Sequence, residues 1–63
     1  MPTFECFFAA ASATADHFIV VEARDDARAC VLASKHLEDH ASFTSVEIFE
    51  GERLVGRFER AGA

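Results

Sequence analysis

The stretch FTSVEIFEGERLVGRFER, residues 43–60, decides the fold of this chain. Two runs rich in β-branched and aromatic residues, 43–50 and 54–60, flank a turn that contains Gly51. Glycine adopts the positive φ that a tight hairpin turn requires, so the pattern predicts a β-hairpin. With a three-residue loop, one face carries Val46, Ile48, Leu54 and Phe58 toward a helix, and the other face carries Glu47, Phe49, Val55, Arg57 and Glu59. A register one residue different would exchange the two faces.

Two further strands are expected near the N-terminus. Residues 3–8, TFECFF, are rich in aromatics, and residues 17–23, HFIVVEA, contain three successive β-branched residues. The second run lacks period-two alternation, so either it is a central strand or something covers one of its faces. Residues 9–15 are taken as a connection between these strands, and residues 61–63 as a disordered tail.

A helix is expected directly after the second strand. Asp25 is the predicted N-cap, and Asp26 lies in the first turn, where negative charge is favourable. At 100° per residue, the stripe predicted to face the sheet contains Ala27, Cys30, Val31, Ser34, Leu37 and Ala41. Because no glycine closes the helix, its end is expected to fray between His40 and Ser42.

Two hairpins joined by a helix predict an α+β fold. We expect a two-layer ββαββ sandwich, in which a four-stranded sheet has one helix across one face. The strand order stays open, and a β-grasp-like 2-1-4-3 arrangement is one candidate. The 63 residues suffice for a single domain over 1–63, with an ordered core over about 3–60.

Charge and composition favour a cytoplasmic protein that binds no membrane, and they make nucleic acid a poor default partner. Lys and Arg total 6 and Asp and Glu total 11, which gives a net charge of −5 that repels polyanions. The N-terminus lacks a signal-peptide pattern, and no apolar run approaches the length of a membrane helix. The two cysteines, Cys6 and Cys30, are therefore expected to stay reduced.

Residues 46–57, VEIFEGERLVGR, and residues 21–29, VEARDDARA, resemble segments of a group of very short bacterial proteins of uncharacterised function. In that group a strand ends in an alanine, acidic residues and a helix follow, and a hairpin closes the chain. The resemblance covers residues 18–58, and Phe49 stands where many relatives have tryptophan. It implies a ββαββ fold and a bacterial source. Because the group has no known active site, it implies no functional residue.

No catalytic, metal or cofactor site is predicted. His36 and His40 lie one helical turn apart, a spacing that can bind zinc, but no third ligand is evident in the sequence. A polar helix end, with both rings on the solvent side, is the favoured interpretation. Cys6 and Cys30 are expected to be inert core residues, and no phosphate-binding glycine loop occurs. We therefore expect a protein that is not an enzyme and has no cofactor.

The seven phenylalanines, with no tyrosine or tryptophan, are the most informative feature of the composition. One helix can cover only one face of a four-stranded sheet, so a helix-free apolar face should remain, and such a face predicts a partner. A homodimer through that face is the favoured interpretation, and an unidentified protein partner is also open. The candidate interface residues are Phe7, Ile19, Val21, Phe49 and Val55. The alternative is a nucleic-acid-binding or regulatory module of the toxin–antitoxin type, using Arg53, Arg57 and Arg60.

Overall fold

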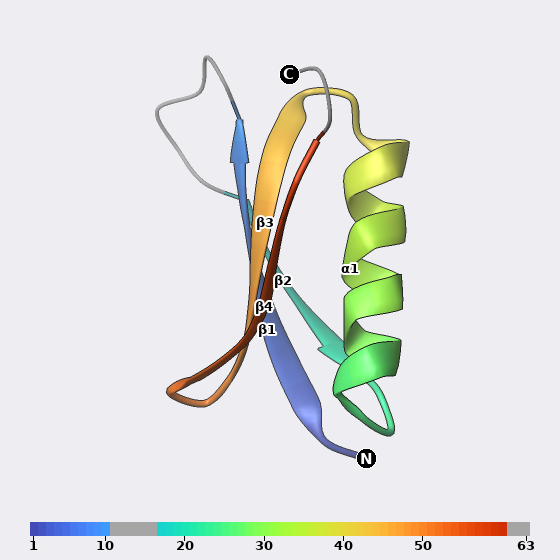
Figure 1. Cartoon of the computed structure of the whole chain (residues 1–63), viewed down its shortest axis with the longest axis vertical. Coiled ribbons are helices and arrows are strands. Elements are labelled where there is room, and N and C mark those ends of the chain that lie inside the picture. Colours follow the sequence, from blue (N-terminus) through green and yellow to red (C-terminus); the bar gives the residue numbers. More distant parts are fainter. Residues whose placement is uncertain (11–16, 61–63) are drawn as a thin grey trace.

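A computed structural model describes residues 1–10 and 17–60, which form a four-stranded antiparallel sheet with one helix packed on one face (Figure 1). This confirms the predicted ββαββ arrangement. The elements are β1 (Thr3–Ala10), β2 (His17–Glu22), α1 (Asp26–Asp39), β3 (Phe43–Glu50) and β4 (Arg53–Glu59). Of the predicted 9–15 connection, residues 9 and 10 belong to β1. The rest of it, and the predicted tail over 61–63, lie outside the described residues.

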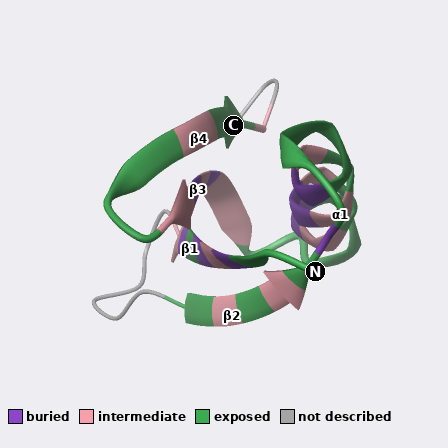
Figure 2. Ribbon diagram, turned by 90° about the horizontal axis from the view of Figure 1, so that it is seen from below, coloured by how far each residue is buried: buried purple, intermediate pink, exposed green. Residues whose placement is uncertain are grey.

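The strand order is β2-β1-β3-β4 rather than the β-grasp-like candidate. Strand β1 pairs antiparallel with both β2 and β3, so β2 and β3 run parallel to each other. Helix α1 connects those two strands by crossing the sheet. The outer strands β2 and β4 are therefore the two edges of the sheet (Figure 2).

The core lies between α1 and the two central strands. Its largest fully buried side chains are Phe4 and Phe8 of β1 and Val46 and Ile48 of β3. Partly buried apolar side chains complete the core; they are Ile19, Val21, Cys30, Leu32, Phe43 and Val55.

The helix faces the sheet with a different stripe from the one predicted. Ala29, Ala33 and Leu37 are buried, whereas Val31 is 54% exposed. The buried stripe is rotated by roughly a quarter turn from the prediction, at 100° per residue. The rotation brings Leu32 against the core and turns Val31 outward.

Both helix ends are capped, and only the N-terminal cap was predicted. The Asp25 side chain accepts a hydrogen bond of 2.8 Å from the Arg28 backbone N–H, which confirms the N-cap. At the other end Arg60, from the chain after β4, donates from its guanidinium to the carbonyl oxygens of Leu37 and His40. With no glycine to cap the helix, which ends at Asp39, this contact supplies a partner to two carbonyl oxygens at its C-terminal end.

The C-terminal hairpin has a two-residue turn and a bulge. Gly51 adopts a φ of 63°, and Glu50 pairs with Arg53 across the turn. The register then shifts by one residue, so that Phe49 faces Leu54 but Ile48 faces Gly56. The bulge exchanges two predicted positions: Val55 packs against the core, and Leu54 is 53% exposed. The other predicted facings in this hairpin hold, because the bulge restores the register beyond it.

Within the described residues, no helix is both long and apolar enough to cross a membrane.

Candidate functional site

The helix-free side of the sheet, here called the open face, carries a continuous line of apolar side chains. Phe18 of β2 and Phe7 of β1 are direct cross-strand partners, with ring centroids 4.9 Å apart. Phe7 also contacts Phe49 of β3, edge to face, with centroids 5.7 Å apart. Phe49 pairs with Leu54 of β4. These four residues, here called the apolar row, cross every strand of the sheet.

Most of the apolar row is accessible to solvent. Phe7 is 40% exposed, Phe18 50% and Leu54 53%, while Phe49 is half-buried between its neighbours. Val20, which lies beside Phe18 on the same face of β2, is 52% exposed. A shallow hollow next to the row is lined by Phe7 and Phe49. Large apolar patches of this kind on a small domain are typical of binding surfaces.

Three predicted interface residues lie elsewhere. Ile19 and Val21 are the cross-strand partners of buried Cys6 and Phe4, so they face the helix. Val55 packs against the core because of the bulge. Of the predicted set, only Phe7 and Phe49 lie on the open face. Phe18, Val20 and Leu54 were missed, because the direction of their side chains depends on the register of β2 against β1 and on the bulge in β4.

The charged residues of the open face are mainly acidic. Glu5 and Glu47 flank Phe7, and Glu22 and Glu59 lie nearer the edges. Arg57, which is the direct cross-strand partner of Glu47, is the basic residue among them. The open face is therefore apolar across its middle and carries net negative charge around it.

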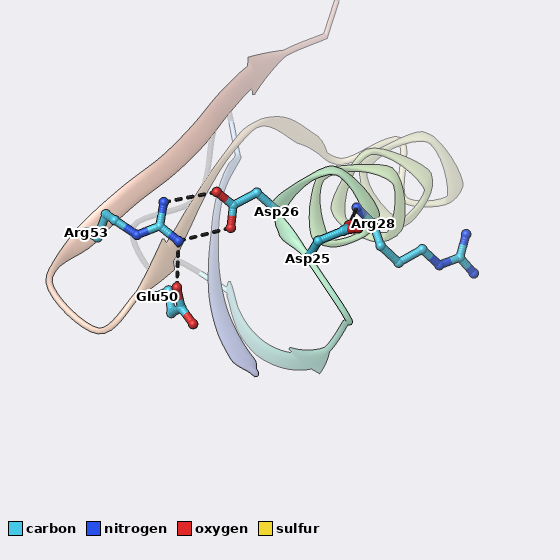
Figure 3. Close-up of polar contacts among 5 residues, drawn as sticks. All are labelled: Asp25, Asp26, Arg28, Glu50 and Arg53. Atoms are coloured by element: carbon cyan, nitrogen blue, oxygen red, sulfur yellow. Dashed lines mark hydrogen bonds and ion pairs between the residues drawn. The ribbon is translucent and has the colours of Figure 1, made fainter. Parts of the chain in front are cut away.

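The three arginines of the alternative hypothesis do not form one basic surface. Arg53 and Arg60 contact opposite ends of α1, whereas Arg57 lies on the open face. Arg53 donates two hydrogen bonds, of 2.9 and 3.0 Å, to the carboxylate of Asp26 at the start of α1, and another of 2.5 Å to Glu50 (Figure 3). These contacts tie the hairpin to the helix, and the hydrogen bonds from Arg53 lower the pKa of Asp26. Arg60 caps the helix end. Among the described residues, Arg57 is in no ion pair.

The rings of His17, His36 and His40 stack at the C-terminal end of α1. His40 is exposed, as expected, whereas His36 is only partly exposed and packs against Phe8. The His36 ring lies 4.2 Å from that of His40 and 5.8 Å from that of His17, and 4.8 Å from the ring of Phe8. Its Nε2 atom is buried and has no hydrogen-bond partner. Residues 1–10 and 17–60 contain no group of three or more His, Cys, Asp or Glu side chains arranged to hold a metal ion.

The histidine stack should make folding stability sensitive to acid. Burial lowers the pKa of His36, and the neighbouring His40 and His17 lower it further, while Asp39 opposes them. The unfolded chain then binds a proton more readily, so stability is full above about pH 6.5 and falls as the pH drops through the lowered pKa. Urea midpoints at pH 7.5 and 5.5 measure this loss, which should be smaller in His36→Gln. An identical pH dependence in both proteins would contradict it.

The two thiols are both free. Burial raises the pKa of Cys6 to about 11, and burial also raises that of Cys30. Since a thiolate is the reactive form, both cysteines are weakly nucleophilic at neutral pH. The position of Cys30 also accounts for a glycine at residue 56, because a Cβ atom there would lie only 3.3 Å from the Cys30 sulfur.

No family model, no curated protein and no solved structure matches this chain. The function must therefore be inferred from the geometry of the chain itself, and the open face is the most distinctive surface of the described residues.

Proposed function

We propose that this chain is a self-associating protein-interaction module, in which the open face binds the open face of a second copy. The strongest support is the apolar row, which exposes Phe7, Phe18 and Leu54 in one line across all four strands. Burying these side chains against another apolar surface stabilises the complex by about 25 cal/mol for each Å² removed from water.

Strand β2 supplies a second argument. It is an edge strand, yet it is apolar on both faces: Ile19 and Val21 pack on the core, and Phe18 and Val20 are exposed. An edge strand with one solvated face is normally polar on that face. Its outer face therefore has the composition of a surface that a partner covers.

A second copy is the partner that the size of the domain favours. A chain of 63 residues buries a small core, and domains of this size commonly need a disulfide, a metal or an additional copy to reach useful stability. Both cysteines are free, so no disulfide reinforces this core. We expect the module to act in the cytoplasm, where free thiols persist.

The charge of the open face should make the affinity of this dimer depend on salt concentration. Glu5, Glu22, Glu47 and Glu59 lie on the open face with Arg57, so two copies repel each other at low ionic strength. Added salt screens this repulsion, and the dimer should become tighter as salt rises from about 20 to 500 mM. Nucleic-acid binding through the arginines would instead weaken steeply with salt. The two hypotheses therefore predict opposite salt dependences.

Sedimentation equilibrium of the wild-type chain and of Phe18→Asp tests the open face. Phe18 lies on an edge strand and is 50% exposed, so the substitution leaves the core intact. Two buried carboxylates per dimer should weaken association through this face at least about 100-fold. The matched control is Val31→Asp, because Val31 is equally exposed but lies on the helix.

Weaker association or a smaller assembly in Phe18→Asp than in the wild type, together with wild-type behaviour in Val31→Asp and unchanged circular dichroism in both, would support the proposal. Equal association of wild-type and Phe18→Asp would refute it. Self-association would also be refuted if the wild-type chain is monomeric by itself but binds a basic, apolar protein. In that case the open face would be the binding surface for a different partner.

A further inference from the structure

The hydrogen bonds of β4 show which of its residues direct their main-chain N–H and C=O groups away from the sheet, at its outer edge. The Arg60 backbone N–H donates to the Thr44 carbonyl at 2.7 Å, so residue 60 points its main-chain groups toward β3. In an antiparallel ladder this direction alternates along the strand. Phe58 and Gly56 therefore also point toward β3, whereas the N–H and C=O groups of Arg57 and Glu59 point outward from the sheet edge.

We propose that β4 pairs antiparallel with the β4 of a second copy, around a two-fold axis that passes beside Phe58. In this register Arg57 lies opposite Glu59 of the second copy, and Glu59 lies opposite its Arg57. Both residues have outward main-chain groups, so both pairs are of the hydrogen-bonded kind and together supply four main-chain hydrogen bonds. The result is a continuous eight-stranded sheet.

Charge selects this register over its neighbours. Arg57 and Glu59 face the same side of the sheet, since their partners on β3 are Glu47 and Ser45. Opposite charges directly across a strand pair are stabilising, and like charges are destabilising. An axis at Arg57 would oppose two arginines, and an axis at Glu59 would oppose two glutamates. Only the register centred on Phe58 pairs each charge with its opposite.

Phe58 adds an apolar contact on the other side of the sheet. It is 37% exposed and lines a hollow between β4 and α1, beside Val31 and Ser34. In the proposed register Phe58 lies directly opposite Phe58 of the second copy. The two residues form a non-hydrogen-bonded pair, in which the side chains are close together. The bulge at Val55 ends the regular edge, so pairing is confined to the segment after it.

This edge is a different surface from the open face and does not depend on the proposed function. If both surfaces operate, assemblies larger than a dimer form. The test therefore uses Phe18→Asp as the background, because that substitution removes the open-face contact while leaving β4 unchanged.

The experiment is a charge swap, measured by sedimentation equilibrium. In the Phe18→Asp background, Arg57→Glu and Glu59→Arg should each weaken the remaining dimer about 10-fold or more, because each places like charges opposite one another. The double substitution Arg57→Glu with Glu59→Arg restores both opposite-charge pairs in reversed order and should restore association. Arg24→Glu makes the same charge change in the loop before α1 and should have little effect.

A Phe18→Asp chain that is monomeric at all accessible concentrations would overturn edge pairing. So would a dimer that neither single substitution weakens, or a double substitution that is no tighter than either single one. The open-face proposal fails separately, by equal association of wild-type and Phe18→Asp.

Discussion

Phe8→Ala should lower the free energy of unfolding by about 3–5 kcal/mol, which is the usual cost of removing a buried aromatic ring. Phe8 is 1% exposed and joins the sheet to the helix end. Its ring centroid lies 5.1 Å from that of Phe43 and 4.8 Å from that of His36. The substitution would therefore leave a cavity between β1, β3 and α1. Neither the sheet nor the helix can fill this cavity by moving alone.

For this chain the loss is large relative to the total. At roughly 0.05–0.15 kcal/mol per residue, 63 residues provide about 3–9 kcal/mol. Phe8→Ala should therefore populate the unfolded state at room temperature, seen as lost helical circular dichroism or as a strongly reduced urea midpoint.

The neighbouring Phe7 is the matched control for Phe8. It has the same side chain on the same strand but is 40% exposed on the open face. At concentrations low enough for a monomer, Phe7→Ala should cost about 1 kcal/mol, mainly from its contacts with other rings. Equal losses for the two variants would mean that the helix does not cover the face assigned to it.

Arg60→Ala should cost about 2–3 kcal/mol, the second largest effect expected. The part-buried guanidinium donates to the carbonyls of Leu37, His40 and Phe43, the last two at 2.9 and 2.8 Å. Without it, the carbonyl oxygens of Leu37 and His40 keep only the backbone N–H groups of His40 and Phe43 as partners, and the positive charge that opposes the helix dipole is lost.

Two measurements separate this role from a general effect of charge. Arg60→Lys keeps the charge but loses the planar fork, so it should recover only part of the stability. Arg24→Ala removes a positive charge from an exposed loop and should change the urea midpoint little. If Arg60→Ala unfolds at the same urea concentration as the wild type, the helix end does not need this contact.

Local features of the sequence determined the elements and their order. Asp25 caps the helix through its own side chain, and Gly51 supplies the positive φ of the turn. The β-branched run at 19–21 forms a strand. Each of these features depends on neighbours only a few residues away, and so can be recognised without the rest of the fold.

The candidate site depended on tertiary structure to a much larger extent. Phe7 and Phe49 could be placed on the open face from alternation within their strands. Phe18 and Leu54 could not, because their direction depends on the register of β2 against β1 and on a bulge in β4.

The strand order and the capping of α1 by Arg60 were likewise decided only by tertiary structure. Arg60 and Leu37, 23 residues apart, meet because β4 ends beside the last turn of the helix. Local sequence determines whether a segment is a strand or a helix, since that choice depends on backbone propensity and caps. Which side chains meet depends on pairing register and chain crossing, and these are set by how the whole core packs.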